Sequence, residues 1–185
     1  MKLNLGCGVN KIDGYFNVDK FDYGQPDKVM DLEITPWDFE SDSVDEVMLD
    51  HTLEHLGQDT GVFINIVKEI YRICKNDSLV RINVPHPRHD NFINDPTHVR
   101  IVTPELISLF SKKNCMHWKS VRASNSPLAL YHNVDFELVS TEIGIEESYL
   151  MQLKQGSLTN EQLFELVRKN NNIATEYRMT VRVIK

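Results

Sequence analysis

Two glycines and two aspartates near the start of the sequence have types and a spacing that suit a nucleoside ligand. Gly6 and Gly8 directly follow the apolar run LNL, so the backbone can turn tightly there and approach a ligand closely. Asp19 ends the next run, NVD, where a carboxylate can accept hydrogen bonds from both hydroxyls of a ribose. Asp31 and Leu32 follow a third run, and their carboxylate and backbone N–H could pair with an adenine edge.

The same region has no feature that would bind phosphate. Lys11 stands where a dinucleotide fingerprint has its third glycine, and no Gly-Lys-Ser or Gly-Lys-Thr occurs. Only about seven residues separate Gly8 from the next apolar run. That is too short for a full helix with its N-terminus facing a pyrophosphate. The sequence therefore predicts an adenosine that carries something other than phosphate.

A second polar cluster, HPRHDNFINDPTHVR at 86–100, follows a later apolar run. His98 is suited to accept a proton near neutral pH, Asp95 could orient it, and Arg100 could pair with a carboxylate. Three histidines and two aspartates within fifteen residues could also hold zinc or manganese. Because their spacing matches no closed structural site, we expect a ligand-binding loop without metal. A metal site and a solvated loop are the alternatives.

Five short apolar runs predict the strands that must position these residues. They are 3–5, 15–18, 27–32, 44–49 and 79–84. Between the last two, apolar side chains recur at helical spacing from Val62 to Ile73, behind Asp59 or Thr60 as the cap.

The second half of the chain predicts two helices and two more strands. Thr103 and Pro104 begin a helix over 103–113, and Thr159 with Gln162 forms a capping box for a helix over 160–171.

Alternating residues at 136–145 and 177–184 predict neighbouring antiparallel strands, whereas 114–135 shows no clear pattern. The expected fold is α/β: an open, mostly parallel Rossmann-like sheet of about seven strands. Its last strand is antiparallel, helices lie on both faces, and the first helix is truncated.

Length and composition bound the possible classes of protein. A chain of 185 residues predicts a single domain, 1–185, that can bury a real core. We expect neither a transmembrane helix nor a secretory signal, because no run of 18 apolar residues occurs. Three widely spaced cysteines fit a reducing cytoplasm, and the net charge of −7 argues against a nucleic-acid partner.

Five segments, in order, resemble class I S-adenosylmethionine-dependent methyltransferases. They are LNLGCG, NVD, MDLEITPW, FESDSVDEVMLDHTLEHL and EIYRICKNDSLVRINVP, and together they span about residues 3–110. The resemblance is strongest to the short methyltransferase type-11-like subgroup. Asn10 departs from the third glycine that many relatives have, and KNDS replaces the usual KPGG turn.

The resemblance implies S-adenosyl-L-methionine as the cofactor. The glycine loop would hold its methionine part, Asp19 its ribose, and Asp31 with Leu32 its adenine, while Asp50 and His51 would border the sulfonium. The cofactor-binding residues that follow by position are Leu5, Gly6, Cys7, Gly8, Asp19, Lys20, Asp31, Leu32, Asp50 and His51.

The resemblance also implies transfer of a methyl group to a small or exposed polar acceptor with release of S-adenosylhomocysteine. The acceptor would be a hydroxyl, carboxylate or amine of a small molecule or a peptide. The candidate catalytic residues are His98, Asp95, Arg100 and His55, the last because it lies one helical turn after His51. No metal is expected among them.

Two other functions remain open at this stage. The domain could be a non-catalytic module that binds the cofactor or a protein partner without turnover. It could also be a nicotinamide-dependent enzyme, which the missing third glycine disfavours. Since no helix precedes the first strand, we expect the site to be covered by 86–100, by 114–135 or by the second subunit of a homodimer.

Overall fold

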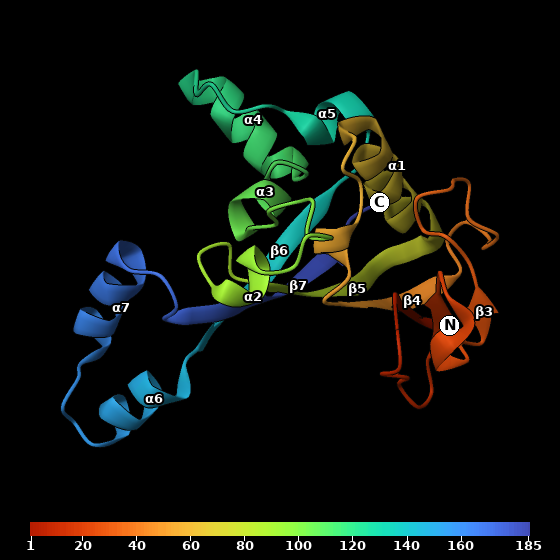
Figure 1. Cartoon of the computed structure of the whole chain (residues 1–185). Coiled ribbons are helices and arrows are strands. Elements are labelled where there is room, and N and C mark those ends of the chain that lie inside the picture. Colours follow the sequence, from red (N-terminus) through yellow and green to blue (C-terminus); the bar gives the residue numbers. More distant parts are fainter.

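One seven-stranded sheet, in the order β3-β2-β1-β4-β5-β7-β6, organises the computed structural model, which describes all residues 1–185 (Figure 1). The strands are β1 Lys2–Leu5, β2 Phe16–Asp19, β3 Lys28–Val29, β4 Val44–Asp50, β5 Cys74–Pro85, β6 Phe136–Ile145 and β7 Ala174–Val183. Neighbours from β3 to β5 pair in parallel, and β7 runs antiparallel between β5 and β6. The predicted open sheet with an antiparallel last strand is confirmed.

The connection between β1 and β2 contains no helix at all, in keeping with its short length. The first helical turn, η1 (Asp22–Gly24), comes only after β2. The third strand is shorter than the predicted 27–32. It ends at Val29 because Asp31 forms a local turn, in which its Oδ1 accepts a hydrogen bond of 3.0 Å from the Glu33 N–H.

Helix α1 (Thr60–Ile73) has the predicted bounds, and its cap is Asp59. The Asp59 carboxylate accepts hydrogen bonds from the N–H groups of Gly61 and Val62, which would otherwise lack partners. A short turn, η2 (Leu53–His55), lies between β4 and this helix.

The predicted helix over 103–113 begins correctly but ends too late. Helix α3 covers only Pro104–Ser108, with Thr103 as its cap. Ser111 then caps a separate helix, α4 (Lys112–Val121), since its hydroxyl accepts a hydrogen bond from the Asn114 N–H. The region without a clear pattern, 114–135, contains most of α4 and all of α5 (Leu128–His132).

Two further helices connect β6 to β7. These are α6 (Glu147–Lys154), which the sequence did not predict, and α7 (Asn160–Lys169), which has the predicted capping box of Thr159 and Gln162. Because β6 is parallel to β5, this helical pair emerges from the edge of the sheet at which the parallel strands end. A short helix, α2 (Asp90–Ile93), lies at the same edge.

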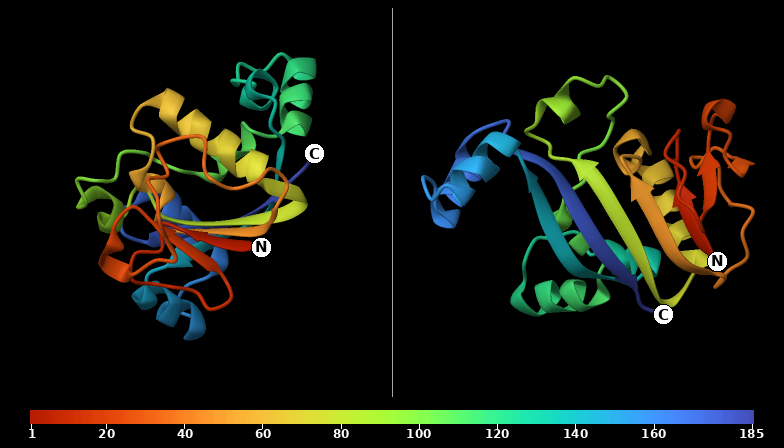
Figure 2. Two further views of the ribbon diagram at one scale, coloured as in Figure 1. Left: turned by 90° about the vertical axis from the view of Figure 1, so that its right-hand side faces the viewer. Right: turned by 90° about the horizontal axis from the view of Figure 1, so that it is seen from below.

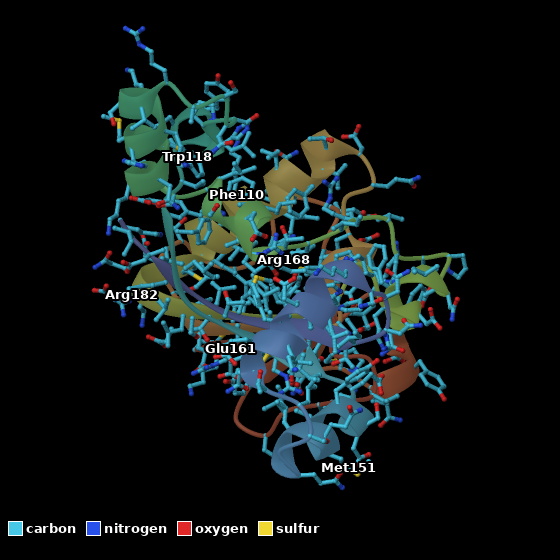
Figure 3. All side chains as sticks on the ribbon, turned by 90° about the vertical axis from the view of Figure 1, so that its left-hand side faces the viewer. Phe110, Trp118, Met151, Glu161, Arg168 and Arg182 are labelled. Carbon is cyan, nitrogen blue, oxygen red and sulfur yellow. The ribbon has the colours of Figure 1, made fainter.

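Helices α1, α3, α4 and α5 lie on one side of the sheet, whereas α6 and α7 extend from its β6–β7 end toward the other side (Figure 2). Figure 3 accordingly shows Trp118 of α4 and Met151 of α6 at opposite ends of the molecule. The core lies under α1, where Val47, Val80 and Ile82 are buried.

Alternate residues of the same strands lie on the other face of the sheet, which no helix covers along its middle. This face carries charged side chains that pair with one another. Glu46 of β4, for example, contacts Lys2 at 2.8 Å and Arg81 at 2.6 Å.

Candidate functional site

The carboxyl ends of β1, β2 and β4 meet around a cleft of about 420 Å³. The residues that line the cleft are Gly6, Gly8, Asp19, Lys20, Phe21, Asp31, Leu32, Glu33, His51, Thr52, His55, Leu56 and Thr97. Eight of the sequence-predicted site residues are among them: Gly6, Gly8, Asp19, Lys20, Asp31, Leu32, His51 and His55. An open parallel sheet binds ligands at this edge.

Gly6 allows the first loop to pass directly over Thr52. Its φ of +73° is in the left-handed region, and a Cβ added there would lie 2.2 Å from Thr52 Cγ2. The Gly6 N–H donates to the carbonyl of Val18 at 2.8 Å, which holds the loop against β2. A side chain at this position would separate the loop from η2 and disturb the cleft wall.

Asp19 holds two backbone segments at the mouth of the cleft. Its Oδ2 accepts a hydrogen bond of 2.8 Å from the Gly8 N–H, and its Oδ1 accepts one of 2.9 Å from the Phe21 N–H. A carboxylate has about four lone-pair sites, so two remain for hydroxyl groups of a ligand. The half-buried Asp19 is therefore both a structural and a ligand-binding candidate.

Asp31 lies across the cleft from the glycine loop and pairs with Lys20 at 2.8 Å. Burial opposes its ionisation, but hydrogen bonds from Lys20 and the Glu33 N–H outweigh burial and lower the pKa of Asp31. Leu32 is buried beside it, and its carbonyl accepts a hydrogen bond of 3.1 Å from Trp37 Nε1. This region thus presents a charged carboxylate next to an anchored backbone.

His51 is a cation at the inner wall of the cleft. Its Nδ1 lies 3.4 Å from Glu54 Oε1, and its Nε2 lies 3.1 Å from Glu176 Oε2. Its contact with Glu54, the nearby Asp50 and the contact with Glu176 raise the pKa of His51 to about 9, although burial opposes this. Both ring nitrogens therefore carry protons at neutral pH.

A chain of polar contacts joins His55 to the 86–100 segment. His55 Nδ1 lies 2.9 Å from Thr97 Oγ1, and the Thr97 hydroxyl donates to Asp95 Oδ1 at 2.6 Å. His98 packs edge-on against His55, with ring centroids 4.6 Å apart. Its own Nδ1 lies 2.9 Å from the Phe92 carbonyl. Three of the four candidate catalytic residues, His55, His98 and Asp95, therefore form one cluster, of which His55 lines the cleft.

The fourth, Arg100, does not reach the cleft. Its guanidinium donates to the carbonyl of Gly57 and stacks on the ring of Phe63, 4.2 Å from the ring centroid. Because these contacts occupy it, Arg100 fastens the segment to the turn after η2 and to α1. It is not placed to orient an acceptor carboxylate.

Three predicted cofactor residues also lie outside the cleft lining. The side chains of Leu5 and Cys7 are buried in the core, so only their backbone can border a ligand. Asp50 accepts a hydrogen bond of 2.7 Å from Asn83 Nδ2 on the neighbouring strand.

Five lining residues were missed by sequence reasoning: Phe21, Glu33, Thr52, Leu56 and Thr97. Most of them directly follow a residue that was predicted, at the end of the same strand or turn. Proximity to a strand end was the available signal, whereas nothing in the local pattern indicated Thr97. One further set, Glu54, His55 and His98, has ligand atoms close enough to hold a metal ion.

No helix is long and apolar enough to span a bilayer. The sequence matches no protein-family model and no curated protein.

The fold, by contrast, is similar to solved structures along nearly the whole chain. A SAM-dependent methyltransferase from Archaeoglobus fulgidus is 21% identical, with 98% of this chain and 85% of that chain covered and a TM-score of 0.63. A SAM-dependent methyltransferase from Methanosarcina mazei is 12% identical, with coverage of 99% and 92% and a TM-score of 0.51. The cyclase SpnF is 12% identical, with coverage of 99% and 74% and a TM-score of 0.54.

The chain therefore has the Rossmann-like fold of class I S-adenosylmethionine-dependent methyltransferases. At this level of identity the likeness concerns the fold, so the function must be inferred from the site.

Proposed function

We propose that this protein binds S-adenosyl-L-methionine in the cleft and transfers its methyl group to a small or exposed polar acceptor, releasing S-adenosylhomocysteine. The observation that carries the proposal is the convergence of Gly6, Asp19 and Asp31 on one cleft that lacks a phosphate-binding helix. The likeness to two structures named as SAM-dependent methyltransferases supports it.

The residues of the cleft fit the parts of this cofactor. Asp19 would accept from the ribose hydroxyls with its two remaining lone-pair sites, and Asp31 would accept from the adenine amino group. Phe21, which is exposed at the cleft, offers a ring face for the adenine. His51, whose two ring nitrogens are held by Glu54 and Glu176, would border the methionine part at the glycine-loop side.

The cofactor supplies an electrophilic methyl carbon on a sulfonium. The chain's contribution is to hold the acceptor in line with that carbon and to exclude water. His55 and Thr97 line the cleft, and His98 and Asp95 stand behind them. We therefore place the acceptor on this side of the cleft. Arg100 has no part in this role.

The alternative is a non-catalytic module that binds the cofactor or a protein partner. The same fold is found in a structure named as a cyclase, so the fold alone does not imply methyl transfer. A module that binds the cofactor without turnover would show binding but no labelled product.

The expected partners are a small-molecule or peptide acceptor and, to cover the cleft, a second copy of the chain. The net charge of −7 argues against nucleic acid. All three cysteines are free and buried, which supports the expected reducing cytoplasm.

Thermal unfolding with S-adenosylhomocysteine tests the cofactor. A ligand at 100 times its Kd stabilises the native state by about 2.7 kcal/mol, which for a chain of this size raises Tm by about 5–10 °C. NAD and ATP at the same concentration should leave Tm unchanged. A shift with NAD and none with S-adenosylhomocysteine would overturn the proposal. Incubation with methyl-labelled cofactor and pooled small molecules or peptides then separates an enzyme from a binding module.

A further inference from the structure

Glu54 is a fully buried carboxylate that accepts no hydrogen bond. Its exposure is 0%, and neither Oε1 nor Oε2 has a hydrogen-bond partner. His51 lies 3.4 Å from Oε1 and offsets part of the charge without satisfying the oxygens. Because an ionised carboxylate in such a position is costly unless something binds it, this arrangement points to a ligand.

The two neighbouring histidines each have Nδ1 held by an oxygen, so Nε2 is the nitrogen left for a ligand, and His98 Nε2 lies 3.8 Å from Asp95 Oδ2. The Thr97 hydroxyl gives its only proton to Asp95, so its oxygen must accept from His55 Nδ1. The Phe92 carbonyl can only accept, so His98 Nδ1 is also the protonated nitrogen. Metal-binding histidines are held in the same way, with the far nitrogen donating to an oxygen.

The ligand atoms of Glu54, His55 and His98 all lie within 4.8 Å of one another. We propose that these three residues bind a divalent transition-metal ion in the wall of the cleft. Bonds of about 2.0–2.2 Å place ligand atoms roughly 3–3.5 Å apart, so binding would draw the side chains together by about 1–2 Å. Two imidazoles and one carboxylate suit zinc, manganese or cobalt better than magnesium or calcium.

The position of the ion suggests the class of acceptor, an inference that rests on the proposed function. Of the three proposed ligands only His55 lines the cleft, next to Thr97, so an acceptor in the cleft would reach the ion from the His55 side. A hydroxyl bound there would lose its proton to water at the cleft mouth more easily. Its oxygen would form the new bond to the methyl carbon, while the bond from carbon to sulfur breaks and its electron pair stays on sulfur. The acceptor class is thus an alcohol or phenol.

The geometry also distinguishes a metal site from a pair of acid–base histidines. A general base needs one imidazole near the acceptor, and the contact of Glu54 with His51 at 3.4 Å would leave both Glu54 oxygens without a hydrogen bond. A metal accounts for the two converging imidazoles and for the two unsatisfied oxygens together. The sequence spacing suggested no such site because Glu54 and His55 come from η2, whereas His98 comes from the 86–100 segment.

Titration of chelator-treated protein with Mn2+, followed by electron paramagnetic resonance, tests the site without any need for activity. We expect one ion per chain. Glu54→Gln and His98→Ala should each weaken Mn2+ binding by more than about 100-fold, and Thr97→Val by about 10–100-fold. His117→Ala, which removes an exposed histidine of α4, should bind like the unaltered protein. Equal affinity in all five proteins, or no saturable binding in the unaltered protein, would overturn the proposal.

Calorimetry with S-adenosylhomocysteine on the same samples separates this proposal from the previous one. If the protein binds S-adenosylhomocysteine but not Mn2+, the metal site is overturned and the cofactor assignment stands. If it binds Mn2+ but not S-adenosylhomocysteine, the cofactor assignment is overturned and the metal site stands. Far-ultraviolet circular dichroism of each variant checks that it is folded, and Glu54→Gln, which preserves shape, remains informative if His98→Ala is not.

Discussion

Two buried glutamates, Glu54 and Glu69, differ in the hydrogen bonds that their carboxylates accept. Glu69 of α1 accepts hydrogen bonds from Arg72 Nε and Nη2, both at 2.8 Å, and from the Trp37 N–H at 2.7 Å. Glu54 of η2 is equally buried and accepts none. A buried carboxylate whose oxygens are hydrogen-bonded belongs to the scaffold, whereas one whose oxygens accept no hydrogen bond indicates a site that something else completes.

The surroundings of Glu69 explain why it is paired. Arg72 also donates to the carbonyls of Trp37 and Phe39, so this ion pair ties the connection after β3 onto α1. Its hydrogen bonds with Arg72 lower the pKa of Glu69 despite burial. Glu54 instead faces the two histidines behind the cleft. The same residue type thus fixes the fold in one region and prepares chemistry in the other.

The largest expected effect is on the free energy of unfolding, and it tests the difference between the two glutamates directly. Glu69→Gln leaves Arg72 without its ionic partner and should lower the free energy of unfolding by about 3–5 kcal/mol. Glu54→Gln removes a buried charge that has no hydrogen bond and loses only the 3.4 Å contact with His51, so in chelator-treated protein it should cost much less than Glu69→Gln. Urea unfolding of both variants measures the difference. An equal loss in the two would mean that Glu54 is a scaffold residue and would end the contrast.

A smaller effect concerns two half-buried carboxylates of the cleft, Asp19 and Asp31. Asp19→Ala and Asp31→Ala each remove a charge-assisted hydrogen bond to the proposed cofactor, worth about 1.5–3 kcal/mol. Asp19→Ala should weaken binding more, because it serves two hydroxyls, and should also loosen the contacts with Gly8 and Phe21.

Asp22→Ala is the matched control, since Asp22 is an exposed acid of η1 that does not line the cleft. Isothermal titration with S-adenosylhomocysteine gives all three affinities. Unchanged affinity for both Asp19→Ala and Asp31→Ala would place the adenosine elsewhere.

The sequence was informative where local physics decides the structure. The strand end at Asp19, the Asp59 cap and the Thr159 capping box all follow from local patterns, and each is present. Asp31 lines the cleft as predicted, although its strand ends two residues earlier, at Val29. Apolar periodicity also identified the antiparallel pair of β6 and β7.

The cluster of Glu54, His55 and His98 could not be predicted in this way, because it depends on the path of 86–100 over η2. The backbone N–H groups of Val99 and Arg100 donate to the Glu54 carbonyl and so hold the segment there. The sequence also suggested that Arg100 could pair with a carboxylate. No local signal indicated that the Gly57 carbonyl and the Phe63 ring would occupy its guanidinium. Contacts between distant segments decided both cases.

The smallest expected effect on stability concerns a third carboxylate, Glu46, which lies on the uncovered face of the sheet and adds a second paired case to the comparison. Burial opposes ionisation of Glu46, but hydrogen bonds from Lys2 and Arg81 lower its pKa from 4.5 to about 2. Its contribution to stability is therefore full above about pH 4.5 and is lost as the pH falls toward 2. Because Lys2 and Arg81 are half-exposed, solvent screening reduces this contribution to about 1 kcal/mol.

Urea unfolding between pH 7 and pH 3 measures it in the unaltered protein and in Glu46→Gln. The variant should be less stable at pH 7, and the gap should narrow as the pH falls, since the unaltered protein then loses the charge that the variant lacks. Glu137→Gln is the control on the same sheet, because its contact with Arg182 is longer, at 3.4 Å, and solvent-exposed. A gap that stays constant with pH would mean that Glu46 acts through packing. Ion pairing on the uncovered face would then contribute nothing measurable to stability. Glu69 would be the one paired carboxylate left to compare with Glu54.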